Sequence, residues 1–305
     1  MKNILLTFLI VGLTPFAYAQ NAKLPIIDMH LHATDRLWSK TRPCFPQPCQ
    51  GAPTEIKNIS DLLPQTIEKM DKHNVVLAAV SWYNLEEVYR WGNADARFLT
   101  CPAIAEPMAT DLRKIENDIK EGKIKVLGEV ASQYQGYSMD DKALDPIFSL
   151  AEKYDLPILV HCAGAGGSNH FPILEGNPMT ISKVIQKHPK LRIYIENAAW
   201  PFGDEIISLM YMYPNVYADL STISWIIPKQ TFHSYLKKLT TAGLGKRLMF
   251  GSDQMLWPEA IDIAIEAINS ADFLTEEEKR DIFYNNAARF LRLSDEQIDQ
   301  HHKKK

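Results

Sequence analysis

The sequence has no excess of basic residues. Its 33 Lys and Arg stand against 37 Asp and Glu, which gives a formal net charge of -4. The lysine-rich end, residues 301–305, is too short to form a basic stripe, so we do not expect binding to nucleic acid. The sequence also has no Gly- or Ser-rich linker and no low-complexity tract. With 46% hydrophobic and 23% charged residues, its composition is typical of a single globular domain with a sizeable core.

Cysteine is scarce as well. The chain has four cysteines, and no two of them have the CxxC spacing of a thiolate zinc site. Cys101 and Cys162 lie in apolar runs, where we expect buried thiols. Cys44 and Cys49 lie in the proline-rich stretch "RPCFPQPCQG". The sequence leaves open whether this pair forms a disulfide, which an oxidising compartment would permit.

The first 19 residues have the pattern of a secretory signal peptide. Lys2 is followed by an apolar stretch from Ile4 to Leu13, and small residues precede the expected cleavage after Ala19. The apolar stretch is shorter than a membrane-spanning helix requires, so we expect no stable membrane anchor, although a retained anchor is the alternative. The pattern predicts a secreted or periplasmic protein whose mature domain covers residues 20–305.

Apolar, β-branched runs alternate with helical patterns along the mature chain. Alternation of this kind predicts a parallel sheet, and eight runs within about 230 residues match a (β/α)8 TIM barrel. An open doubly wound sheet is the runner-up, but no Gly-rich phosphate-binding turn follows the first run. Residues 257–293 predict two amphipathic helices that close the outside or bottom of the barrel, and residues 33–60 form an insertion that should overhang the mouth. The eight runs are 25–32, 74–82, 98–105, 125–132, 156–164, 192–200, 215–222 and 247–253.

Polar residues recur where the predicted strands end. His30 and His32 are two positions apart, so both imidazoles project from the same face of the first strand. Catalytic groups of such barrels lie at the carboxyl ends of the strands, where the later runs place His161 and Asp253. Three imidazoles and one carboxylate at one mouth predict a metal site.

Together, "DMHLH" near the start, "FGSD" in the eighth run and the ending "NNAARFLRL" resemble the amidohydrolase superfamily, in particular its amidohydrolase-related branch. The resemblance covers residues 24–293. It implies that His30, His32, His161 and Asp253 bind a divalent metal, most often zinc, and that Asp253 also accepts a proton from the attacking water.

The sixth run departs from this family, because Asn197 stands where relatives usually carry a histidine. An amide is a poor transition-metal ligand and a good hydrogen-bonding group. The exchange therefore favours one metal over two and a substrate contact at Asn197, with loss of activity as the alternative. Glu129, which ends the fourth run, is either a catalytic acid or base or a ligand of a second metal with His161. Glu196 should alternate to the other face and lie in the barrel wall.

Several residues near the strand ends are candidates for substrate binding. Arg36 could pair with a carboxylate, and His170 follows the fifth run in a glycine-rich stretch. Trp82 and Trp200 belong to a group of aromatic residues that could form an apolar pocket. The group also contains Trp38, Tyr83, Tyr134, Trp225 and Trp257.

From these residues we expect a secreted, metal-dependent hydrolase that uses one zinc ion to activate water against an amide, lactone or ester-like bond of a small molecule. Asp253 and Glu129 are its predicted catalytic residues. Two alternatives stay open. One is a metal-dependent decarboxylase of an aromatic or unsaturated acid, and the other is a barrel that binds a small molecule without turnover. The oligomeric state also stays open.

Overall fold

The structure, a computed structural model, describes residues 23–37, 56–162 and 172–303. The predicted signal peptide, Cys44, Cys49, Trp38 and His170 lie outside these residues. Cys101 and Cys162 are buried free thiols, as predicted. Among the described residues, no helix is both long and apolar enough to cross a membrane.

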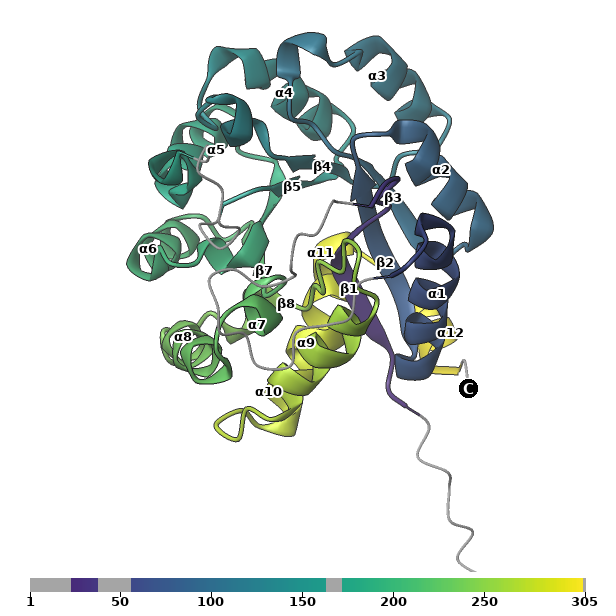
Figure 1. Ribbon diagram of the computed structural model, residues 1–305. Coiled ribbons are helices and arrows are strands. Elements are labelled where there is room, and N and C mark those ends of the chain that lie inside the picture. Colours follow the sequence, from purple (N-terminus) through teal and green to yellow (C-terminus); the bar gives the residue numbers. More distant parts are fainter. Residues whose placement is uncertain (1–22, 38–55, 163–171, 304–305) are drawn as a thin grey trace, which may run out of the picture.

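Eight parallel strands of the described chain occupy the centre of the molecule, and helices surround them (Figure 1). The strands pair in chain order, as β1-β2-β3 and as β4-β5-β6-β7-β8. Most of their residues are buried, which explains why they read as continuous apolar runs rather than as alternating ones. The strands are β1 (Ile26–His32), β2 (Val75–Trp82), β3 (Phe98–Pro102), β4 (Leu127–Val130), β5 (Pro157–Val160), β6 (Arg192–Ile195), β7 (Val216–Asp219) and β8 (Leu248–Met249).

Backbone contacts at two seams close the two sets of strands into a barrel. Ile104, just after β3, forms a parallel bridge with Val130 of β4. At the other seam, the amide of Met29 donates to the carbonyl of Phe250 at 2.9 Å, and the amide of Asp253 donates to the carbonyl of His30 at 2.7 Å. The predicted (β/α)8 barrel is confirmed, and its closure brings the first and last strands side by side.

The helices that follow the strands are amphipathic or short. Asp111 caps one of them, α3, by accepting from the amides of Arg113 and Lys114. The α-helices up to residue 269 are α1 (Leu62–His73), α2 (Leu85–Ala94), α3 (Leu112–Lys120), α4 (Asp145–Lys153), α5 (Ser182–Lys187), α6 (Gly203–Met212), α7 (Ile223–Ile226), α8 (Lys229–Thr241) and α9 (Glu259–Asn269). Short 3-10 turns include η2 (Pro107–Ala109), η3 (Ser132–Gln135), η5 (Ile173–Gly176) and η7 (Glu196–Ala199).

The C-terminal helices close the end of the barrel at which the strands begin. Thr275 and Glu278 form a capping box at α10 (Glu276–Arg280), which continues through η9 (Asp281–Asn285) into α11 (Asn286–Leu291). Arg280 donates to the carbonyl of Pro25 at 2.6 Å, just before β1. Arg192, the first residue of β6, donates to the carbonyl of Phe290 at 2.7 Å. The structure agrees with the prediction that residues 257–293 close the outside or bottom of the barrel, because α9 packs against α1 and α7 on the outside.

One more helix follows α11. Residues Asp295–Lys303 form helix α12, which no pattern in the sequence analysis predicted. Its start carries a capping pair, because the amide of Gln297 donates to Ser294 Oγ at 3.2 Å and the Gln297 side chain accepts from the Ser294 amide at 2.9 Å. His301 is buried, and its Nδ1 lies 2.9 Å from the hydroxyl of Tyr284.

A charged cluster joins α9 to α1. The carboxylate of Asp262 lies 2.5 Å from Lys69 Nζ, 2.7 Å from Lys72 Nζ and 2.5 Å from His73 Nε2. Partial burial opposes ionisation of Asp262, but hydrogen bonds from the two lysines and from His73 outweigh it and hold the pKa of this carboxyl well below its ordinary value.

We predict that Asp262→Asn lowers the free energy of unfolding by about 1 kcal/mol at pH 7, a modest value because solvent screens this partly exposed cluster. Since folding lowers the pKa of Asp262, its contribution is present above about pH 4 and is lost as the pH falls through the folded-state value. Urea unfolding of both proteins at pH 7 and at lower pH measures the difference. Asp272→Asn, at an exposed turn, is the control. A difference that grows at low pH would contradict the prediction.

Candidate metal centre

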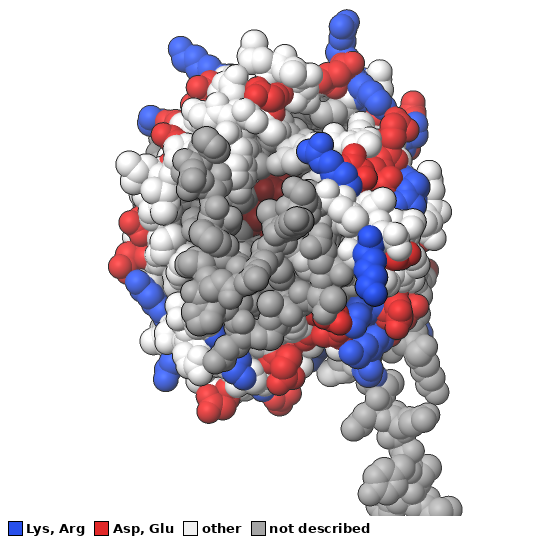
Figure 2. Space-filling model, viewed as in Figure 1, with Lys and Arg blue, Asp and Glu red and all other residues white. Residues whose placement is uncertain are grey.

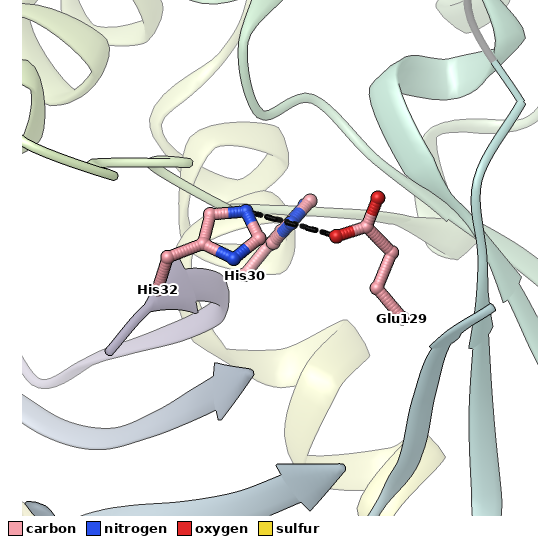
Figure 3. Close-up of side chains that lie close together, drawn as sticks. All are labelled: His30, His32 and Glu129. Atoms are coloured by element: carbon pink, nitrogen blue, oxygen red, sulfur yellow. Dashed lines mark hydrogen bonds and ion pairs between the residues drawn. The ribbon is translucent and has the colours of Figure 1, made fainter. Parts of the chain in front are cut away.

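The imidazoles of His30 and His32 converge at the mouth of the barrel. Their Nε2 atoms lie 3.2 Å apart, and both side chains are buried (Figure 3). Nδ1 of His30 lies 3.1 Å from Ser221 Oγ, and Nδ1 of His32 lies 3.0 Å from Ser81 Oγ. Each ring is therefore held at Nδ1 by a serine, while its Nε2 faces the other ring.

The hydrogen bonds of Ser221 fix the tautomer of His30. Ser221 Oγ lies 2.5 Å from Asp219 Oδ1 and 3.0 Å from Asn197 Oδ1, and both of these atoms can only accept. The single hydroxyl proton is used there, so Ser221 must accept from the Nδ1–H of His30. In the neutral imidazole the lone pair is then on Nε2, which is the form in which an imidazole binds a metal.

Two carboxylates complete this group. Oδ1 of Asp253 lies 2.9 Å from His32 Nε2 and 3.9 Å from His30 Nε2. This oxygen is buried and accepts no hydrogen bond from the described residues, whereas Oδ2 accepts from Thr222 Oγ1. Oε2 of Glu129 lies 3.7 Å from His32 Nε2 and 3.9 Å from His30 Nε2.

His161 lies on the other side of Glu129. Its Nδ1 is 2.9 Å from Glu129 Oε1 and 2.6 Å from Glu196 Oε2. The structure thus brings the four predicted ligands into one buried cluster, but in two groups that share Glu129. His30 and His32 lie with Glu129 and Asp253, and His161 lies with Glu129 and Glu196.

The expected position of Glu196 in the barrel wall is wrong. Strand β6 ends at Ile195, and Asn197 then has φ 55° and ψ 24°, in the left-handed region that Asn tolerates better than most residues. Ala198 and Ala199 also have positive φ. Side-chain alternation holds only within a strand, so this turn lets the side chains of Glu196 and Asn197 both join the cluster.

Asn197 lies behind the imidazoles rather than at the open mouth. Its amide Nδ2 donates to Glu196 Oε1 at 3.0 Å, and its Oδ1 accepts from Ser221. The residue is 2% exposed. Both polar ends of the side chain are therefore used within the protein, an arrangement that favours a positioning role over the predicted contact with substrate.

Sequence reasoning missed three polar residues of the site. Asp219 ends β7, and its Oδ2 lies 3.6 Å from His30 Nδ1. Ser221 follows two positions later, and Ser81 belongs to β2. A signal for Asp219 was present, because this carboxylate lies at the carboxyl end of a predicted strand.

The charges of the cluster act on one another. Burial opposes protonation of His30, but the carboxylates of Glu196, Asp253 and Asp219 outweigh it and raise the pKa of His30 above its ordinary value. Burial likewise opposes ionisation of Glu129, while His161 and the other imidazoles lower the pKa of Glu129. Burial and the nearby charge of Glu129 raise the pKa of Glu196.

The remaining predicted residues are placed at different distances from the cluster. The ring of Trp82 packs edge-on against His32, with centroids 5.8 Å apart, and the ring of Tyr134 lies 5.2 Å from that of His161. Trp200 is half-buried after the turn at Asn197, and Arg36 is exposed beside Asp35. Trp225 and Trp257 pack on each other in the core.

Figure 2 shows the face of the molecule at the mouth of the barrel. This face has a hollow, with acidic atoms at its bottom.

The donor set fits a divalent cation. Two nitrogens that bind one tetrahedral zinc ion, each at about 2.0–2.1 Å, lie about 3.3 Å apart. The Nε2 atoms of His30 and His32 are 3.2 Å apart, and the buried Oδ1 of Asp253 lacks a hydrogen bond from the described residues. Imidazole nitrogens and a carboxylate oxygen that face one another in a buried site are unfavourable unless a proton or a cation lies between them.

A closed (β/α)8 barrel with imidazoles and carboxylates at the carboxyl ends of its strands defines a class of metal-binding barrel enzymes. The chain belongs to the amidohydrolase family, whose sequence profile, described as Amidohydrolase, matches residues 27–293. The resemblance found in the sequence is thereby confirmed. Members of this family include hydrolases and metal-dependent decarboxylases.

One curated relative is the protein fluG of Emericella nidulans, which is 22% identical over 145 residues. The match covers 43% of this chain and only 17% of that protein. Among solved structures, an uncharacterized TIM-barrel protein from Bordetella bronchiseptica has a TM-score of 0.66 and 19% identity, and the match covers 88% of this chain and 99% of that one.

A second solved structure is the 5-carboxyvanillate decarboxylase of Novosphingobium aromaticivorans, with bound manganese and a nitrobenzoic acid. Its TM-score is 0.55 at 17% identity, and the match covers 78% of this chain and 85% of that one. At these identities the likeness to solved structures shows the fold alone.

We predict that Ser221→Ala lowers the affinity for zinc by about 10-fold, because the residue fixes the tautomer and orientation of His30. Titration calorimetry of metal-stripped protein with zinc measures the change. Ser270→Ala, after α9 and away from the cluster, is the matched control and should leave the affinity unchanged. Equal affinities in wild type and Ser221→Ala would show that the serine does not orient the ligand.

Proposed function

We propose that this protein is a metal-dependent hydrolase that acts on an amide, lactone or ester-like bond of a small molecule. The observation that carries the proposal is the buried Oδ1 of Asp253, which accepts no hydrogen bond from the described residues and lies 2.9 Å from Nε2 of His32. A buried carboxylate oxygen beside two imidazole nitrogens is suited to bind a cation and to exchange a proton. The leader pattern of residues 1–19 supports export of the enzyme.

In this proposal His30, His32 and Asp253 hold the cation, and Glu129 lies within reach of the same point. A divalent ion bound there lowers the pKa of a water molecule from about 15.7 to about 7 and polarises a carbonyl group. Thr222 holds Oδ2 of Asp253, so Oδ1 is the atom that accepts the proton of the attacking water and returns it to the leaving group.

The walls of the hollow determine how the substrate is held. Trp82 and Tyr134 contact the rings of His32 and His161, and they exclude water from that side of the cluster. We propose that these aromatic rings pack against the substrate. We propose further that Trp200, Arg36 and His170 contact its outer parts.

Decarboxylation is the second candidate, and the family supports it because members include metal-dependent decarboxylases. The same ligands would then hold a cation that binds the substrate acid, and no water would attack. The two reactions differ in their products, since hydrolysis adds water across a bond and decarboxylation releases carbon dioxide.

We predict that zinc-loaded protein hydrolyses members of a panel of small amides, lactones and cyclic ureas. Asp253→Asn should lower kcat at least about 100-fold, because the proton acceptor is lost. Asp299→Asn, on the exposed face of α12, is the control and should keep full activity. Product analysis by mass spectrometry measures turnover. Carbon dioxide release from hydroxybenzoate-type acids without any hydrolysis would favour the lyase, and no turnover by metal-loaded protein would favour a binding protein.

A further inference from the structure

Aromatic side chains flank the candidate metal centre on two sides. On one side, the ring centroid of Trp82 lies 5.8 Å from that of His32 and 5.4 Å from that of Tyr83. On the other side, the ring centroid of Tyr134 lies 5.2 Å from that of His161. Tyr83 is 51% exposed and Tyr134 is 39% exposed, so both rings offer surface at the mouth of the barrel. Exposed rings beside a buried charged cluster are typical of the wall of a binding pocket.

Glu129 lies between these two sides. Its Oε2 is 3.7 Å from Nε2 of His32, and its Oε1 is 2.9 Å from Nδ1 of His161. Its charge also reaches the two tyrosines. Partial burial and the charge of Glu129 raise the pKa of Tyr83 above its ordinary value. Partial burial also raises the pKa of Tyr134, where His161 opposes the shift and Glu129 adds to it. Both phenol groups therefore lie within the electric field of the acidic cluster.

The cluster stays negative when its positive charges are counted. Its four buried carboxylates are those of Glu129, Glu196, Asp219 and Asp253. Among the described residues, the ion pairs of these carboxylates are all with histidines, and no lysine or arginine is buried. A divalent cation at the candidate metal centre and a proton on His161 together supply three positive charges. One negative charge then remains without a partner, which is unfavourable in a buried site.

Aromatic rings and a carboxylate together suit an ammonium group. The face of a Trp or Tyr ring attracts a cation that lies within about 6 Å of its centroid, and the attraction is stronger where water is excluded. A carboxylate nearby adds direct charge attraction, which a low dielectric strengthens. The acidic atoms at the bottom of the hollow attract a cation into the mouth (Figure 2). An organic cation gains from all three effects, because its alkyl groups also pack against the rings.

We propose that the substrate carries a positively charged ammonium group, which lies between Trp82 and Tyr134 and pairs with Glu129. The inference rests on the proposed function, because it names the substrate class of the same site. The ammonium group holds the substrate while the amide, lactone or ester-like bond lies beside the metal. An aromatic or unsaturated acid without an amine has no group for this position, so the inference favours hydrolysis over decarboxylation.

The test compares two small probes, choline and its uncharged isostere 3,3-dimethylbutan-1-ol. The two molecules have the same shape and the same hydroxyl group, and they differ in the charge of one atom. Binding of each probe to the full chain in the presence of zinc is measured by ligand-observed nuclear magnetic resonance. We expect the wild type to bind choline at least about 10-fold more tightly than the isostere.

Substitutions of one tyrosine assign this preference to the aromatic wall. Tyr134→Leu should lower the affinity for choline about 10-fold, whereas Tyr134→Phe should keep it, because the face of a Phe ring also attracts a cation. The isostere should bind all these proteins equally weakly. Tyr211→Leu is the matched control and should leave both affinities unchanged. Tyr211 is 61% exposed near the end of α6, where its hydroxyl donates to the carbonyl of Ala242.

The outcomes separate this inference from the proposed function. Equal affinities of the wild type for the two probes, or no binding of choline, overturns the inference, and so does unchanged affinity for choline in folded Tyr134→Leu. If Tyr134→Leu fails to fold by circular dichroism, Tyr83→Leu replaces it with the same expected loss. Hydrolysis that requires Asp253, without a preference for choline, overturns this inference alone. A preference for choline without any hydrolysis overturns the proposed function and keeps the ammonium site.

Discussion

The structure depends on one electrostatic constraint, which is that several carboxylates and imidazoles are buried together at one end of a barrel. Carboxylates in an apolar interior are stable only when their charges are compensated and their oxygens accept hydrogen bonds. The surrounding residues meet much of this demand. Asp219 accepts from Ser221 and from the amide of Asn197, and Asp253 accepts from Thr222. These residues leave one position unfilled, next to Asp253 Oδ1 and between the imidazoles. A cation fits at this position.

Closure of the barrel and assembly of the site are the same event. Residues 30 and 253 lie at opposite ends of the sequence, yet the amide of Asp253 donates to the carbonyl of His30 at 2.7 Å. The amide of Ser252 likewise donates to Asp28 Oδ1 at 2.9 Å. Gly251 permits this approach, because a Cβ there would lie only 3.0 Å from Cβ of His30. The seam between β8 and β1 cannot move without moving two of the proposed ligands.

The predictions from the sequence were correct where the regular geometry of a strand decides the direction of a side chain. The two-residue period of a strand predicted that His30 and His32 converge, and the rule for strand ends predicted that Glu129, His161 and Asp253 would join them. They failed at Glu196 because the strand stops one residue earlier and left-handed backbone follows. No periodic rule describes such a turn.

The serines Ser81 and Ser221 were invisible for another reason. A hydroxyl has no charge and no fixed role, so its importance follows only from the atoms around it. Helix α12 was missed because a short polar segment does not show the apolar period of a helix, although its capping pair, Ser294 and Gln297, was present in the sequence.

The same arrangement links metal binding to folding. In the unfolded chain the carboxylates of Glu129, Glu196, Asp219 and Asp253 are solvated and far apart, so their mutual repulsion arises only when the barrel closes. A cation that binds the native site and not the unfolded chain removes this repulsion and stabilises the fold by mass action. The strained turn at Asn197, Ala198 and Ala199 belongs to the same balance, because left-handed backbone at non-glycine residues costs of order 1–3 kcal/mol each. The fold tolerates that cost at the point where the turn brings Glu196 against His161. Stability and chemistry in this barrel are therefore set by the same few side chains.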